Sequence, residues 1–290
     1  MNRSTIRLAL LAAAVAAVPA AAQSYTPVRP AAVGDVWRNQ EDFKLSLAIV
    51  ASAHGQTTPP ERGTQHQEWD YTTALTAISP GGRGNSGTVT YHRCRVTEKK
   101  GDDPAVIRKS SREGKTVTFR RVGGRTVRLV NGKRLPEPKP RKGEPPGRGE
   151  EPEVRFLPEG PLEVGEEWSL DGSTLANALG SHGGGSGIIR GRFLEVVRRD
   201  GRPCMHARLN VEISGPLEDE SATVTMQLSG DLYQALDIGR TLSVSLAGPV
   251  TLSGQFQDGG ETVKMTGEGS AVYTRQIRWL KLAGKPQPGP

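Results

Sequence analysis

The chain is poor in cysteine, aromatic residues and long apolar runs, and each shortage excludes a class of protein. Its 290 residues include two cysteines, too few for a small disulfide-rich scaffold or a zinc site of paired Cys-x-x-Cys motifs. Aromatic residues make up 5%, so stacking platforms for single-stranded nucleic acid or sugars are poorly supplied. Beyond the N-terminal segment, no apolar run has the length of a membrane-spanning helix.

The N-terminal segment has the order of a secretory signal peptide. Arg3 and Arg7 precede an uncharged run, Leu8 to Val18, and small residues lead up to Ala22. A positive region, a short apolar region and small residues at the cut are typical of a signal that is removed. The pattern predicts cleavage after residue 22 and a mature protein of 268 residues that is periplasmic or secreted. No cysteine near the cut offers a lipid-attachment site.

Positive charge is concentrated in one part of the chain. The net charge is +7, and between Tyr91 and Arg148 there are 18 Lys and Arg against 6 Asp and Glu. A basic field of this size favours contact with an anionic lipid or envelope polymer, while export argues against nucleic acid. The alternative is a set of solvated charges that keeps sheet edges from pairing. The residues predicted to make the anionic contact are Arg120, Arg121, Arg125, Arg128, Lys133 and Arg134.

Alternation of apolar and polar residues predicts strands along most of the chain. Phe43, Leu45, Leu47 and Ile49 alternate with polar or small residues, as in a half-buried strand. Asn131-Gly132 and Asp200-Gly201 each stand between two such runs, which indicates tight hairpins. Only Ser173 to Leu179 looks helical, with Ser173 or Thr174 as the cap and Gly180 as the stop. The predicted fold is all-β, an antiparallel meander forming two curled lobes or an open barrel, with one short helix.

A Pro-rich stretch, 136–153, divides the chain and predicts a linker or long loop. On its two sides we expect an N-terminal β lobe, 32–135, and a C-terminal β lobe, 154–283, followed by a disordered tail, 284–290. Both halves open on Val, Gly, an acidic residue, any residue and Trp: Val33 to Trp37 and Val164 to Trp168. This echo suggests two related lobes. Alternatively, a turn leading into a strand simply favours Gly followed by a buried Trp.

The second half resembles exported bacterial β-domains of unknown function. The resemblance rests on Leu157-Pro158, Pro161, Val164-Gly165 and Trp168, and on the later turn Gly230-Asp231 to Gly239-Arg240; it covers about residues 156 to 280. In outline such domains are similar to the curled-sheet carriers of lipoproteins and lipids. The resemblance therefore implies a concave apolar face. It implies no catalytic residues.

The two cysteines each have a histidine two residues away, as His92-Arg93-Cys94 and Cys204-Met205-His206. Residues two apart in a strand face the same way, so His92, Cys94, Cys204 and His206 can form a soft-ligand metal site if the strands meet. An oxidising compartment favours instead a Cys94–Cys204 disulfide joining the lobes. The third alternative is two unpaired thiols.

Two further groups of residues carry weaker signals. His66, Glu68 and Asp70 alternate on one strand face and can bind a metal or serve acid–base work, although exposed sheet faces produce such triplets routinely. The Gly-rich run 180–187 lacks the ending of a phosphate-binding loop and predicts a flexible loop with His182 exposed.

Taken together, these features favour a non-enzymatic exported binding or envelope-associated protein with a lipid or anionic polymer as ligand. No cofactor and no catalytic residue is predicted, and the sequence indicates no particular protein partner. Two other functions remain open: a metal-dependent hydrolase or redox protein using the His and Cys pairs, and a structural adaptor that binds another protein along a sheet edge.

Overall fold

The computed structural model describes residues 23–28, 31–78, 84–122, 125–130, 132–134, 154–179, 184–216, 221–258 and 261–283. The predicted signal peptide, the Pro-rich linker, His182 and the C-terminal tail lie outside these ranges. The described elements are β1 (Ser24–Tyr25), β2 (Val36–Ala53), β3 (Gln56–Thr57), β4 (Glu61–Ile78), β5 (Gly84–Lys100), β6 (Val106–Lys109), β7 (Thr116–Val122), β8 (Arg125–Val130), β9 (Lys133–Arg134), β10 (Leu162–Glu163), β11 (Glu167–Asp171), α1 (Ser173–Ala178), β12 (Ser186–Arg199), β13 (Arg202–Pro216), β14 (Ala222–Ala235), β15 (Arg240–Asp258) and β16 (Glu261–Lys281).

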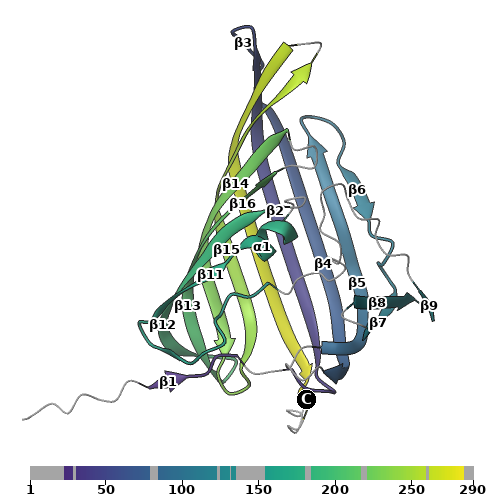
Figure 1. The fold of residues 1–290 in the computed structure, drawn as a ribbon, viewed down its shortest axis with the longest axis vertical. Coiled ribbons are helices and arrows are strands. Elements are labelled where there is room, and N and C mark those ends of the chain that lie inside the picture. Colours follow the sequence, from purple (N-terminus) through teal and green to yellow (C-terminus); the bar gives the residue numbers. More distant parts are fainter. Residues whose placement is uncertain are drawn as a thin grey trace, which may run out of the picture.

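Almost all strands belong to one antiparallel sheet of 14 strands, which curls without closing on itself (Figure 1). Its order is β11-β12-β13-β14-β15-β16-β2-β4-β5-β7-β8-β9, with β3 on β2 and β6 on β5. The predicted all-β, antiparallel fold is confirmed. The halves before and after residues 135–153 are neighbours in this sheet, because β2 pairs with β16 from Val36 opposite Lys281 to Ser52 opposite Lys264. That each half is a lobe in its own right stays a prediction.

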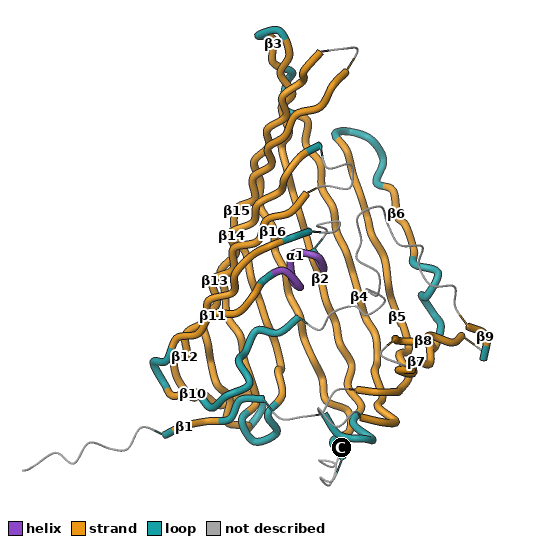
Figure 2. The backbone as a smooth tube through the Cα atoms, in the orientation of Figure 1, coloured by secondary structure: helices purple, strands orange, loops and turns teal. Residues whose placement is uncertain are grey.

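The main core fills the concave face of the curl. Alternate residues of β12 to β16 and of β2 point into it, including Phe193, Leu209, Leu246 and Phe43. The segment 154–179, with α1, covers this face: its residues Phe156, Leu157, Leu162, Leu175, Ala176 and Leu179 are buried in the same cluster. In Figure 2 α1 lies in front of the strands, and it contacts β12 and β13, next to the edge strand β11. Part of the concave face is thus covered by the chain's own segment 154–179.

Turn chemistry agrees with the sequence at the hairpins that the structure describes. Asp200 and Gly201, between β12 and β13, both have positive φ, 50° and 74°. Two consecutive positive φ values are the backbone of the type I′ turn, whose twist matches that of the flanking strands. The helix begins differently from the prediction. Its N-cap is Gly172 without a side-chain cap, and the Asp171 carboxylate instead accepts hydrogen bonds from the Ser173 amide and hydroxyl.

The repeated Val-Gly-acid phrase forms the same turn twice. Gly34 and Gly165 share a φ of 92°, a left-handed conformation that glycine adopts without strain. The following acidic residue, Asp35 or Glu166, accepts a hydrogen bond from an amide three residues earlier. Each phrase also pairs with one residue of the next strand, Leu75 or Phe193, through two backbone hydrogen bonds. The repeated sequence therefore forms the same turn at the start of β2 and of β11.

Candidate functional sites on the two faces of the sheet

The concave face continues past the part covered by residues 154–179. On β2, Phe43 and Leu47 are buried, whereas Leu45 and Ile49 stay partly exposed on the same face. Met265 of β16, opposite Ala51, is also partly exposed beside the core. Ile49 and Met265 extend the apolar surface toward the end of β2, and Leu45 adds partly exposed surface between the two buried residues. These partly exposed side chains form the part of the concave face, here called the open patch, on which an apolar ligand can lie.

A row of amides borders the open patch on β4. Gln65 lies opposite Leu45, and Gln67 lies opposite Phe43, so both share the concave face. Gln67 Nε2 donates to Gln65 Oε1 at 3.1 Å, and Gln65 Nε2 donates to Glu98 Oε1 of β5 at 3.4 Å. An apolar surface beside a few fixed polar groups is the usual composition of a small-molecule site.

On the same face, a polar network around buried Asn39 lies between the open patch and the start of β2. Arg275 Nε donates to Asn39 Oδ1 at 3.0 Å, while the Asn39 amide donates to Glu41 and to the Tyr71 hydroxyl. The Tyr71 hydroxyl in turn donates to Glu41 at 3.1 Å. Burial, and after it the nearby Glu41 carboxylate, raises the pKa of Tyr273, so this phenol stays neutral. The satisfied network fixes the register of β2, β4 and β16 below the open patch.

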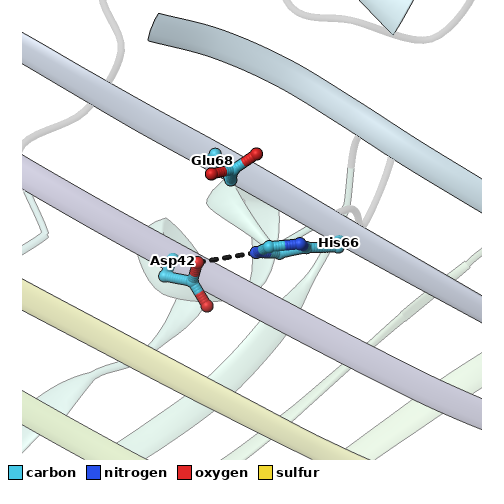
Figure 3. Close-up of side chains that lie close together, drawn as sticks. All are labelled: Asp42, His66 and Glu68. Carbon is cyan, nitrogen blue, oxygen red and sulfur yellow. Dashed lines mark hydrogen bonds and ion pairs between the residues drawn. The ribbon is translucent and has the colours of Figure 1, made fainter. Parts of the chain in front are cut away.

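The convex face carries a compact group of metal-ligating side chains: Asp42 of β2 with His66 and Glu68 of β4 (Figure 3). One ligand atom from each lies within 4.8 Å of the others, and His66 Nε2 is 2.6 Å from Asp42 Oδ2. All three residues are half-buried. We call them the Asp42 cluster. The sequence predicted His66, Glu68 and Asp70 as a group; the structure keeps the first two and brings in Asp42 from the neighbouring strand.

Asp70 is not part of the Asp42 cluster, because its carboxylate pairs with Arg38. Arg38 donates to both of its carboxylate oxygens, at 2.8 and 2.6 Å, and this hydrogen bonding is the main cause that lowers the pKa of Asp70. Glu68 pairs with Arg93 at 2.9 Å. Asp42, Glu68, Asp70 and Arg93 also line an open depression on this face. Carboxylates and cationic side chains are thus paired with one another along the convex face of β2 and β4.

The structure does not bring the two cysteines together. Both are buried, and they lie in separate clusters: Cys94 packs with Tyr91 and Val117, and Cys204 with Ala235 and Ile238. Five strands of the sheet, β14, β15, β16, β2 and β4, separate β13 from β5. The Cys94–Cys204 disulfide is therefore absent from this structure.

The predicted four-residue metal set is not assembled either. A β-bulge at His92, where Asp70 opposes Arg93 and Tyr71 opposes Tyr91, breaks the alternation, so Cys94 turns into the concave cluster. His92 Nε2 instead lies 2.9 Å from Thr72 Oγ1.

In the other half of the sheet, on β13, the His206 ring stacks on Tyr233, 4.7 Å between centroids, and both of its nitrogens contact carboxylates. Nδ1 is 3.2 Å from Glu195, and Nε2 is 3.1 Å from Asp231. His206 thus has its own partners, far along the sheet from His92.

The basic residues singled out from the sequence spread over both faces of the β7–β8 hairpin. Arg120 lies opposite Val127, and Arg128 lies opposite Phe119, so these two arginines point to different faces. Arg120, Lys133 and Arg134 are exposed, whereas Arg121 and Arg128 are half-buried; the side chain of Arg125 lies outside the described residues.

Within the described ranges, no helix combines the length and the hydropathy that a membrane crossing requires. Comparison with known proteins identifies no family: no family model matches the chain, and neither does any curated protein.

Some solved structures share a similar outline. Lipovitellin, from a structure of its lipid–protein interactions, matches 90% of this chain at 9% identity with a TM-score of 0.36, and this chain spans 26% of its length. An outer membrane channel from Pseudomonas putida F1 matches 86% of this chain and 96% of its own length at 9% identity and a TM-score of 0.22. A LolA superfamily protein from Nitrosomonas europaea matches 84% of this chain and 87% of its own at 11% identity and a TM-score of 0.12.

Proposed function

We propose that this protein is a periplasmic or secreted binding protein that holds an amphiphilic, lipid-like molecule against the open patch. The observation that carries the proposal is the apolar surface left partly exposed on the concave face of β2. Phe43 and Leu47 are buried, while Leu45 and Ile49 on the same face remain partly exposed. An apolar chain laid there removes this surface from water, which stabilises a complex by about 25 cal/mol for each Å² of apolar surface buried.

The neighbouring polar groups support an amphiphile rather than a pure hydrocarbon. Gln65 and Gln67 offer amide donors and acceptors beside the apolar side chains. A hydroxyl-bearing or other polar head group can hydrogen-bond to these amides. We therefore expect the bound amphiphile to lie along β2, with its apolar chain toward Ile49 and Met265 and its head group toward Gln67.

The basic segment extends this proposal to the source of the ligand. We infer that Arg120, Lys133 and Arg134, which are exposed on or beside the β7–β8 hairpin, contact an anionic envelope surface from which the amphiphile is taken. Exposed cations attract such a surface over about 10 Å at 0.1 M salt, so the contact weakens as salt is added.

The test measures binding of a fluorescent long-chain fatty acid to the full mature chain. Leu45→Glu places a charge in the open patch and is expected to weaken binding at least tenfold. Val272→Glu is the matched control, because Val272 is an exposed apolar residue on the other face of β16. Equal binding by both variants, or none by the unaltered protein, overturns the proposal.

A further inference from the structure

The geometry points to a second binding site on the opposite face: Asp42, His66 and Glu68 form a site for a divalent cation of the zinc class. It is independent of ligand binding at the open patch, since these three side chains project from the convex face. The first support is the register of two central strands. Asp42 lies directly opposite Glu68, and His66 lies opposite Lys44, one same-face position along.

The strands hold the three side chains close together without any loop. Directly opposed residues in an antiparallel pair have Cβ atoms about 4.5–5.5 Å apart, and diagonal neighbours remain within reach. Accordingly, the Asp42, His66 and Glu68 ligand atoms all lie within 4.8 Å of one another. Phe43, between Asp42 and the next convex position, is buried in the core and anchors β2. Sites on strands keep their geometry better than sites on loops.

The donor set selects the class of cation. One imidazole nitrogen and two carboxylate oxygens suit a borderline ion such as Zn²⁺, which binds these atoms at about 2.0–2.2 Å. Calcium prefers six to eight oxygens, and a soft ion prefers sulfur. Three protein ligands leave a fourth position, which solvent can fill because all three residues are only half-buried.

The contacts within the cluster agree with this assignment. His66 Nε2 already points at Asp42 Oδ2, 2.6 Å away, so a cation inserted between them replaces a proton shared by the same two atoms (Figure 3). The neighbouring Lys44 and Arg93 each pair with one oxygen of a cluster carboxylate and leave its other oxygen available to a metal ion. Lys44 pairs with Asp42 Oδ1 at 3.3 Å, and Arg93 pairs with Glu68 Oε1 at 2.9 Å. Each carboxylate therefore retains its second oxygen for a metal.

These cations also limit the affinity. Lys44 and Arg93 place positive charge beside the incoming ion, which weakens binding relative to a closed structural zinc site. The proposed site thus takes up and releases its ion, rather than holding it as a permanent part of the fold.

The experiment is calorimetric titration of chelator-treated full-length protein with Zn²⁺. We expect one ion per chain, with at least tenfold weaker binding in His66→Ala and in Glu68→Gln. His92→Ala is the matched control, because His92 lies on the neighbouring strand β5 and contacts Thr72 of β4, outside the cluster; it is expected to bind as the unaltered protein does. Ca²⁺ is expected to bind far more weakly than Zn²⁺.

The proposal is overturned if Zn²⁺ does not bind stoichiometrically, if His66→Ala binds as well as the unaltered protein, or if Ca²⁺ binds more tightly. Should His66→Ala lose its cooperative thermal transition, the near-isosteric Glu68→Gln decides. Loss of binding in His92→Ala with retention in His66→Ala assigns the ion to other ligands.

Discussion

Asp35 and Arg240 form a buried ion pair between residues 205 positions apart, with Asp35 Oδ2 3.1 Å from Arg240 Nη2. The Asp35 side chain is 2% exposed and the Arg240 side chain 11%. The same carboxylate accepts hydrogen bonds from the amides of Ala32 and Ala283. One side chain thus joins the turn before β2, the start of β15 and the end of the described chain.

Removal of this carboxylate is expected to be costly. Asp35→Ala removes the carboxylate that pairs with the buried Arg240 guanidinium, and we predict a loss of about 3–5 kcal/mol in the free energy of unfolding. Urea denaturation followed by circular dichroism measures it. The control is Glu212→Ala, which breaks the exposed Arg190–Glu212 pair and is expected to cost at most about 1 kcal/mol. Comparable losses in the two variants contradict the anchoring role of Asp35.

Glu113 makes stability depend on acid pH. Arg95 donates to both carboxylate oxygens, and the Cys94 amide donates as well; these bonds, that of Arg95 first, lower the pKa of Glu113 to about 2 from 4.5. Because the folded pKa is the lower one, the stabilisation is complete above 4.5 and is lost as the pH falls through about 2.

The comparison of Glu113→Gln with the unaltered protein tests this sign. The variant is expected to be less stable at neutral pH, and the difference between the two free energies of unfolding should shrink between pH 4.5 and 2. A difference that is constant across this range assigns the effect to packing instead of charge.

The thiols provide a direct test of strand placement. Cys94 and Cys204 are buried, and burial raises the pKa of the Cys204 thiol, so neither is expected to react with Ellman's reagent in the folded protein. Under non-reducing denaturation both of the chain's cysteines should react. Absence of thiol in the denatured protein means that a disulfide has formed and that the strand order of the structure is wrong.

Gly191 is expected to tolerate no side chain. A Cβ there would lie 2.1 Å from Cζ2 of Trp168, whose indole packs across the glycine and donates to the Phe156 carbonyl at 3.0 Å. We predict that Gly191→Ala costs about 1–3 kcal/mol and shifts tryptophan emission toward that of exposed indole. Gly160→Ala, whose Cβ meets nothing within 4 Å, should stay within about 0.5 kcal/mol of the unaltered protein.

Local features of the fold follow from the sequence, and long-range ones do not. The alternation of Phe43 to Ile49 and the Asp200-Gly201 turn depend on neighbours along the chain, and both appear as predicted. The pairing of β2 with β16 joins residues more than two hundred positions apart, which no local pattern encodes.

The same division holds for the candidate sites. His66 and Glu68 could be grouped by their spacing, but Asp42 joins them only through the β2–β4 register. The bulge at His92 reverses the side that the spacing assigned to Cys94, because one extra residue shifts every later side chain. As a result Tyr91 and Cys94, three residues apart, are buried on the same face.

The most direct test of the central claim is photocrosslinking of the full mature chain with a diazirine-bearing long-chain fatty acid, followed by peptide mapping. Binding at the open patch predicts adducts on residues 43–51 of β2 and 263–267 of β16, and their loss in Leu45→Glu but not in Val272→Glu. Adducts confined to other strands, or labelling equally strong in Leu45→Glu, contradict it.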